Sequence, residues 1–305
     1  MTSDRQKEEM AGVEQPWRQV TIVQIEIAGF THTRGFDDFV QLLQHGFERL
    51  GVSVRVAVNQ FSTVGVNVVI GANVLTRLPK SLRPEFPKNT VIFNLDQVHP
   101  ASPWMEEYYL SLLRAHPVWD YSSVNIARLA EHFGIHRTVL VKIGHMPEMS
   151  RVESVVSPDI DVLFYGNLSP RRAKVLMDIT QTGINLVSLT GVYGKERDAF
   201  IARAKLILNL QYYDFPGIAE IVRLSFLLSN RKAVVTESGD HIAIERDVEP
   251  CVAPARYDDL AETCVKLCRD DAARKLIEDR GYALFSRRDQ AAFLSEAMRN
   301  TAMNP

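Results

Sequence analysis

Two adjacent arginines, Arg171 and Arg172, stand in the first turn of a predicted helix, where exposed backbone N–H groups already make the helix end positive. The segment reads DVLFYGNLSPRRAKVLMDITQTG, residues 161–183. Ser169 is a favourable N-cap residue and Pro170 suits the first helical position. Since a helix N-terminus attracts anions, the arginines and the N–H groups together could bind a diphosphate. The alternative is a solvated basic helix end, or arginines paired with nearby acids.

The loops after the next three predicted strands carry further candidate groups, and the last of these loops begins with Glu237. The loop TGVYGKERD offers the flat ring of Tyr193 to a base, and Gly194 permits close backbone approach. The loop QYYDFPG leads into a helix whose first turn holds Glu220, and a carboxylate there could accept both hydroxyls of a ribose or could simply cap the helix. Arg223 lies one turn later on the same face. The predicted nucleotide-sugar contacts are Gly166, Ser169, Arg171, Arg172, Tyr193, Gly194, Tyr212, Glu220, Arg223 and Glu237.

The elements that position these residues alternate between strand and helix. Strands are expected at 20–28, 52–58, 67–70, 90–95, 118–123, 139–143, 161–165, 185–189, 206–210 and 233–236. Helices are expected at 36–50, 104–115, 125–133, 170–182, 196–204, 219–229, 257–269, 272–284 and 288–299. Continuous apolar strands joined by helices are typical of a parallel sheet covered on both faces. The predicted fold class is α/β, with two doubly wound Rossmann-like domains facing across a cleft.

The bulk composition excludes several classes of protein. The chain has 305 residues and a formal net charge of −2, which argues against a strong non-specific grip on nucleic acid. Its three cysteines are not grouped as metal ligands, so no metal site is expected. The opening MTSDRQKEEM has no apolar signal core and no run is long enough to span a membrane, which predicts a cytoplasmic protein.

Two stretches of the second half, FYGNLSPRR and AKLILNLQYYDFPGIAEIVRLSFLLSNRKAVVTE, resemble the donor-binding domain of GT-B glycosyltransferases over about residues 158–245. The resemblance implies that the basic pair holds a nucleotide diphosphate and that Glu220 binds the ribose. It implies hexosyl transfer from a nucleotide-diphosphate sugar, a UDP-sugar first among them, with no bound cofactor and no metal. The E-x7-E pair of many retaining members is absent, because Leu228 stands eight residues after Glu220. An inverting transfer is therefore expected.

The domain boundaries are placed from changes in composition. A disordered N-terminus is expected over 1–16, an acceptor domain over 17–148 and a polar linker over 149–158. The nucleotide-sugar domain is expected over 159–285. By analogy with GT-B chains, a C-terminal helix within 286–305 is expected to cross back to the first domain.

An inverting transfer needs a general base near the acceptor hydroxyl. The predicted catalytic residues are His32, in the loop GFTHTRG after the first strand, and Asp96, in NLDQVHP after an apolar strand. An ordinary surface histidine is the alternative for the first, and a residue that orients a basic partner is the alternative for the second. The other candidate bases are His99 and Asp120, and the residues expected to touch the donor sugar near the hinge are His145 and Glu148.

Two other classes of function stay open at this stage. One is a non-catalytic two-domain protein that binds a nucleotide or a sugar and closes on it. The other is a different sugar-nucleotide enzyme, such as an epimerase or a phosphorylase, although no G-x-G-x-x-G fingerprint for a dinucleotide follows any predicted strand. The acceptor could be a glycan, a protein, a small molecule or a modified base, and the oligomeric state is open.

Overall fold

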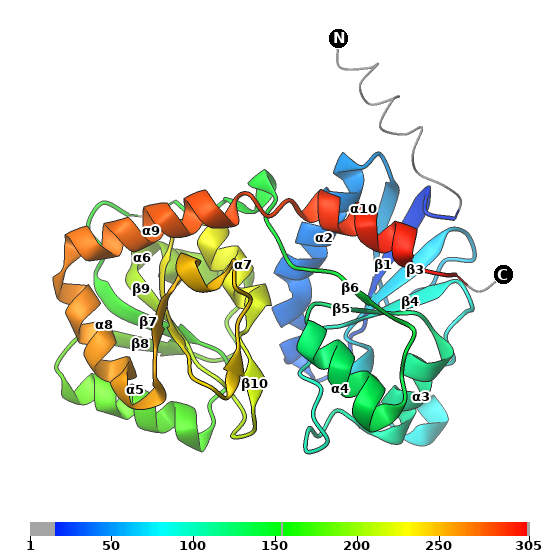
Figure 1. Ribbon diagram of the computed structural model, residues 1–305, viewed down its shortest axis with the longest axis horizontal. Helices are drawn as coiled ribbons and strands as arrows, with labels where there is room; N and C mark the ends of the chain where they lie inside the picture. The colour runs from blue at the N-terminus through cyan, green and yellow to red at the C-terminus, as the bar shows by residue number, and fades with distance from the viewer. Residues whose placement is uncertain (1–15, 154, 304–305) are drawn as a thin grey trace, which may run out of the picture. The chain divides into compact units, whose positions relative to one another are not determined.

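The computed structural model describes residues 16–153 and 155–303, which form two α/β units (Figure 1). The first unit comprises the described residues up to Ile143 together with those from Asp289 onward, and the second spans Gly144–Arg288. All but the last residue of the predicted disordered segment 1–16 lies outside the described residues. The predicted fold class, two Rossmann-like α/β domains, is confirmed at the level of each unit.

The first unit is built on a six-stranded parallel sheet in the order β2-β1-β3-β4-β5-β6. The strands are β1 Gln19–Gln24, β2 Ser53–Val58, β3 Val66–Ile70, β4 Thr90–Asn94, β5 Val118–Asp120 and β6 Thr138–Leu140. The helices are η1 Thr31–Phe36, α2 Asp37–Arg49, η2 Ala72–Arg77, η3 Lys80–Leu82, α3 Glu107–Ala115, α4 Ser123–Phe133 and α10 Gln290–Asn300. Strands β3 and β4 are buried at every position, which is why they read as continuous apolar runs.

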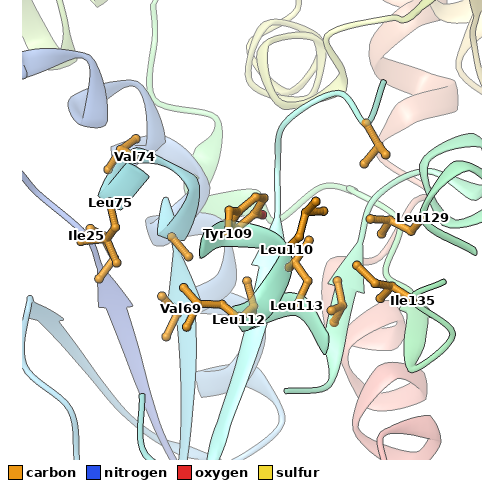
Figure 2. Close-up of a cluster of buried hydrophobic side chains, with 14 of the residues drawn as sticks. Ile25, Val69, Val74, Leu75, Tyr109, Leu110, Leu112, Leu113, Leu129 and Ile135 are labelled. Carbon is orange, nitrogen blue, oxygen red and sulfur yellow. The ribbon is translucent and has the colours of Figure 1, made fainter. Parts of the chain in front are cut away.

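The first unit has an apolar core on the α3 side of the sheet. Figure 2 shows its side chains, which come from the end of β1, from β3, from η2 and from α3 and α4. The members labelled there are Ile25, Val69, Val74, Leu75, Tyr109, Leu110, Leu112, Leu113, Leu129 and Ile135. This layer supports the loops that follow β1, β3 and β4, where the predicted acceptor-side residues lie.

The C-terminal helix α10 belongs to the first unit and packs against α2. The two helices approach closely at Gly46, where a Cβ atom would stand 2.6 Å from Leu294 Cδ1. The end of the helix is fixed by the indole of Trp119, which donates to Thr301 Oγ1 over 2.7 Å in the buried interior. The structure thus divides the chain at 143/144 and at 288/289, compared with the expected boundaries near 148 and 285.

The second unit is built on a five-stranded parallel sheet in the order β13-β11-β9-β7-β8. Its strands are β7 Ile160–Tyr165, β8 Leu186–Leu189, β9 Ala204–Asn209, β11 Ala233–Glu237 and β13 Ala253–Ala255, with a separate parallel pair β10 Gly217–Ile218 and β12 Ile242–Ala243. Its helices are η4 Pro147–Met149, α5 Pro170–Gln181, α6 Gly194–Arg203, α7 Ile221–Ser229, η5 Glu249–Cys251, η6 Tyr257–Asp259, α8 Leu260–Arg269 and α9 Asp271–Phe285. Helices α5 and α8 lie side by side over one face of the sheet (Figure 1).

One sequence expectation about local structure needs correction. The first strand was expected to reach Ala28, but β1 ends at Gln24 because the chain then turns and Ile27 bridges back to Phe30. The polar linker expected over 149–158 begins bound to the second unit, since the backbone N–H groups of Arg151 and Val152 donate to Asn230 Oδ1 at 2.8 and 2.7 Å. No helix among the described residues is long and apolar enough to cross a membrane.

Candidate active site

The second unit has a topological switch point between β7 and β9. From β7 the chain moves outward to β8 and then returns to β9 on the other side of β7. In open parallel sheets the loops diverge at such a point, and ligands bind beyond the carboxyl ends of those strands. The loop from Gly166 to Ser169 follows β7, and Gln211 and Tyr212 lie just beyond β9. The predicted donor site therefore lies at this switch point.

Arg171 lies at the start of α5 and reaches across to the ends of β9 and β11. Its Nη1 donates to the carbonyl of Gln211 over 2.8 Å and to Glu237 Oε2 over 2.8 Å, and its Nη2 donates to Glu237 Oε1 over 2.6 Å. Tyr257 lies under the guanidinium, 4.7 Å from its Cζ, and donates its hydroxyl to the carbonyl of Arg171. The side chain is 14% exposed, so part of it remains open to a ligand.

Arg172 is almost completely buried and holds several loops together. It is 2% exposed and donates to the carbonyls of Asn167, Leu210 and Gln211 and to Glu220 Oε1. These partners take up most of its five N–H donors. Burial lowers its pKa below the usual arginine range, and Arg223 and Arg171 nearby act in the same direction, against the carboxylate of Glu220. The structure therefore gives this residue the geometry of an anchor within the site.

Glu220 lies between two arginines at the start of α7. Its Oε1 accepts from Arg172 Nη2 at 2.5 Å, and its Oε2 is 2.6 Å from Arg223 Nη1. Arg223 also donates to Asn209 Oδ1 over 3.0 Å. The Glu220 side chain is 24% exposed, and a carboxylate has about four lone-pair positions. Two of these remain open to outside donors, which is the capacity that two ribose hydroxyls require.

Gly166 lies directly against the guanidinium groups of Arg172 and Arg223. Its φ of +139° is one that side chains rarely adopt, and a Cβ there would stand 3.0 Å from Arg223 Nη2 and 3.4 Å from Arg172 Nη1. The loop after β8 is attached to the same glycine, because Thr190 Oγ1 donates to the carbonyl of Gly166 over 3.1 Å. The strand end after β7 can therefore carry only a glycine without displacing the guanidinium groups.

The remaining predicted donor residues fall into three positions. Ser169 caps α5, since its Oγ accepts from the N–H of Arg172, as expected. Tyr212 is 38% exposed and lies beside Arg172, whose Cζ is 5.2 Å from its ring. Tyr193 and Gly194 begin α6 after the edge strand β8. Glu237 has a side chain only 1% exposed, so it supports Arg171 and does not face a ligand.

The buried and half-buried charged side chains of this site carry more positive than negative charge. The guanidinium groups of Arg171, Arg172 and Arg223 meet two shielded carboxylates, Glu220 and Glu237. Burial would raise the pKa of Glu237, but the hydrogen bonds and charge of Arg171 outweigh it and hold that pKa below its usual range. Asp214 lies 3.3 Å from Arg171, but its side chain is 92% exposed, so water screens its charge. The arrangement suits an anionic ligand.

Sequence reasoning missed three residues that organise the site. Gln211 accepts from both α5 arginines with its carbonyl, and its N–H donates to Glu237 Oε2 over 3.0 Å. Asn209 orients Arg223, and Tyr257 lies under Arg171. The polar Asn209 at the end of the apolar run LILNL was a usable signal. Gln211 acts through its backbone carbonyl and Tyr257 through a ring from a later element, and no local sequence signal marks either role.

On the first unit, His32 and Asp96 follow different strands. His32 lies in η1 after β1, half-buried, with its ring 5.2 Å from the ring of Phe30. Asp96 follows β4 and accepts from Asn73 Nδ2 over 2.9 Å. Its backbone carbonyl accepts from Asn94 and Asn125, both at 2.9 Å. Three hydrogen bonds therefore fix the loop that carries Asp96.

Asp120 lies beneath this loop and is completely buried. Its carboxylate accepts from Asn94 Nδ2 at 2.6 Å, from the N–H of Ser122 at 2.8 Å and from Asn125 Nδ2 at 3.1 Å. Burial raises the pKa of Asp120 to about 8 despite these three donors. Since the same two asparagines hold the carbonyl of Asp96, this carboxyl is a support for the loop and is not accessible as a base.

His99 and His145, the other histidine candidates, have contacts of their own. His99 accepts from the N–H of Ala101 through Nδ1, and burial together with Arg128 lowers its pKa. His145 is buried at the far end of α7 from Glu220, with Nδ1 2.9 Å from Ser229 Oγ, so it does not reach the donor loops. Within the described ranges, no three His, Cys, Asp or Glu side chains are placed to hold a metal ion.

No family model matches this sequence. Among curated proteins, the chain is 25% identical over 154 residues to the uncharacterized protein L140 of Acanthamoeba polyphaga mimivirus, a stretch that covers 50% of each protein. The chain therefore matches only about half the length of that relative.

Solved structures resemble the chain over nearly its whole length. WaaG, a glycosyltransferase involved in lipopolysaccharide biosynthesis, matches with a TM-score of 0.59 at 12% identity, over 94% of this chain and 100% of its own. Anabaena Alr3699/HepE, solved in complex with UDP-glucose, matches with a TM-score of 0.56 at 13% identity, over 93% and 98%. The chain therefore has the fold of this class, the GT-B glycosyltransferases. The predicted family resemblance is confirmed at that level.

Proposed function

We propose that this protein is a glycosyltransferase that moves a hexose from a nucleotide-diphosphate sugar, a UDP-sugar first among the candidates, to an acceptor hydroxyl. One observation carries the proposal beyond the fold. The β7 and β9 loops of the second unit are joined through Arg171, Arg172 and the carbonyl of Gln211, at the switch point, with an excess of positive charge. A departing nucleotide diphosphate is the anion that such a site would stabilise.

The geometry supports a division of roles among the donor residues. Arg171 and Arg223 keep part of their surface open, at 14% exposure each, and we assign the diphosphate to them and to the start of α5. Arg172 and Glu237 position these groups from below. Glu220 accepts the ribose hydroxyls. The exposed ring of Tyr212, with Tyr193 in the loop after β8, is assigned to the base or the sugar.

The proposed reaction is an inverting displacement that needs no metal. The acceptor hydroxyl oxygen forms a bond to the anomeric carbon as the bond from that carbon to the diphosphate oxygen breaks. The hydroxyl proton passes to a base on the first unit, which we assign to His32 or Asp96. The electron pair of the broken bond leaves on the nucleotide diphosphate, whose charge the guanidinium groups offset.

Ligand-dependent stability is the first test. The protein is heated with UDP, GDP, dTDP, CMP or ADP, and a ligand present at 100 times its Kd should add about 2.7 kcal/mol of stability. We expect UDP to give the largest shift. If none of these nucleotides raised the thermal stability, the proposed donor site would be wrong.

Turnover separates an enzyme from a binding protein. Release of UDP from UDP-glucose is measured with a panel of acceptors for the wild type, H32A and D96N. At least one variant should lose roughly a hundredfold or more in rate while its affinity for UDP is unchanged. Tight nucleotide binding with equal turnover in all three proteins would instead favour the non-catalytic binding function.

A further inference from the structure

Arg77 lies on the surface of the first unit, with its guanidinium close to the faces of two aromatic rings. It ends η2, the turn that follows β3, and its Cζ is 4.3 Å from the centroid of Phe30 and 5.2 Å from that of Trp104. The two rings are themselves in edge contact, with centroids 6.4 Å apart. Both rings pack on the core layer of Figure 2, which fixes the stack from below.

The N–H donors of Arg77 are left open by this arrangement. A cation over an aromatic face still has its N–H groups available to other partners, and a guanidinium carries five of them in one plane. Across residues 16–153 and 155–303, no carboxylate, carbonyl or side-chain oxygen accepts from this group, although the arginine is exposed. A cation held in one orientation with unused, coplanar donors is suited to a carboxylate or a phosphate.

The stack lies where a ligand of this sheet is expected. In the order β2-β1-β3-β4, the chain reverses direction between β1 and β3, so these two strands form the switch point of the first unit. Phe30 follows β1 and Arg77 follows β3. His32, a candidate base, lies 5.2 Å from the same Phe30 ring that carries Arg77. The open donors and the proposed base thus share one aromatic support.

We propose that the acceptor is a carbohydrate bearing a negative charge, a carboxylate or a phosphate, which Arg77 binds beside Phe30 and Trp104. This proposal rests on the proposed glycosyl transfer and adds the class of its acceptor. The rings present apolar surface to a sugar, and the guanidinium selects the charged member of a set of otherwise similar sugars. The neighbouring Lys80 adds a second exposed positive charge on the same connection.

Direct binding of simple sugars to the whole chain tests this assignment. Glucose 6-phosphate, glucuronate and glucose are titrated by calorimetry at low salt, so that the phosphate, the carboxylate and the neutral sugar form matched arms. We expect one of the charged sugars to bind at least about tenfold more tightly than glucose. R77M, which keeps an apolar side chain over the rings, should abolish this preference, and R77K should keep part of it.

A matched arginine provides the control. Arg55 is exposed on the edge strand β2, and R55M should leave the preference for the charged sugar unchanged. UDP affinity, measured on the same samples, should be equal in all variants. Equal binding of charged and neutral sugars by the wild type, or a preference that survives R77M, overturns the assignment. Absence of UDP binding alongside an intact Arg77-dependent preference would overturn the donor site instead.

Discussion

Arg171 and Glu237 form a bidentate ion pair, with both guanidinium Nη atoms facing both carboxylate oxygens at 2.6 and 2.8 Å. The pair joins the start of α5 to the end of β11, and the carboxylate is 1% exposed. Arginines that the sequence presents as ligand contacts are thus also structural. Removing Arg171 leaves the buried carboxylate of Glu237 without its guanidinium partner. This lowers the free energy of unfolding more than the loss of one exposed contact would.

A double-mutant cycle measures this coupling. R171M should destabilise the second unit by about 3–5 kcal/mol, because the buried Glu237 then keeps only the N–H of Gln211 and His241, 3.5 Å away, as partners. E237Q should cost less, since Arg171 keeps the Gln211 carbonyl and some access to water. Urea unfolding of both single variants and the double variant should give a coupling energy of about 2–3 kcal/mol. Simple additivity of the two effects would contradict the proposed pairing.

Gly166 should be irreplaceable at the donor site. G166A places a Cβ at 3.0 Å from Arg223 Nη2 on a backbone with φ of +139°, so the variant should lose about 1–3 kcal/mol of stability and at least tenfold in UDP affinity. Gly183 is the matched control, because its φ is also positive at +80° but nothing lies within 4 Å of its Cβ position. G183A should lose stability and keep full UDP affinity. Equal affinity losses in calorimetry would argue against a specific role for Gly166.

The sequence predicted the order of elements and the edge of the sheet that carries the site. Apolar strands separated by amphipathic helices have two clear periodicities, so β3, β4, β7 and β11 lie close to their expected positions. The short strands β10, β12 and β13 have two or three residues, which is too few for a period to be recognised. They are fixed by long-range pairing, β13 against the longer β11 and β10 against β12, which local sequence does not reveal.

The sequence could not predict which way the charged side chains turn. Arg171 and Arg172 are adjacent and similar in type, yet one is 14% exposed at the side chain and the other 3%. Both arginines donate to the carbonyl of Gln211, just beyond β9. Arg172 also donates to the carbonyls of Asn167 and Leu210, whereas Arg171 lies beside the exposed Asp214. Long-range carbonyl acceptors leave no trace in local composition.

Glu220 should select the ribose of the nucleotide. Its carboxylate has acceptor positions left after Arg172 and Arg223, and E220Q replaces one acceptor oxygen by an amide donor. We expect the wild type to bind UDP about tenfold more tightly than 2′-deoxy-UDP, and E220Q to lose most of that ratio. Calorimetry with both nucleotides measures it. A ratio unchanged in E220Q would assign the carboxylate to positioning the arginines alone.

Asp120 should make the stability of the first unit fall as the pH rises. Burial raises its pKa to about 8, so between about pH 4 and pH 8 the folded chain retains a proton that the unfolded chain has lost. Unfolding free energy then decreases with pH, by up to about 1.4 kcal/mol per pH unit for one group. D120N cannot titrate and should remove this slope, although it should also cost about 1–3 kcal/mol at every pH because its amide faces an N–H donor.

The comparison of slopes isolates the effect of Asp120 from its structural cost. Urea unfolding is measured at pH 5, 6, 7 and 8 for the wild type, D120N and D178N, where Asp178 is an exposed acid on α5 paired with Lys174. The difference in unfolding free energy between the wild type and D120N should shrink as the pH rises, while D178N should stay parallel to the wild type. The loop that carries Asp96 hangs on the same asparagines, so any turnover that uses Asp96 should weaken along with this network. Parallel curves for all three proteins would mean that Asp120 is ionised in the folded chain throughout this range.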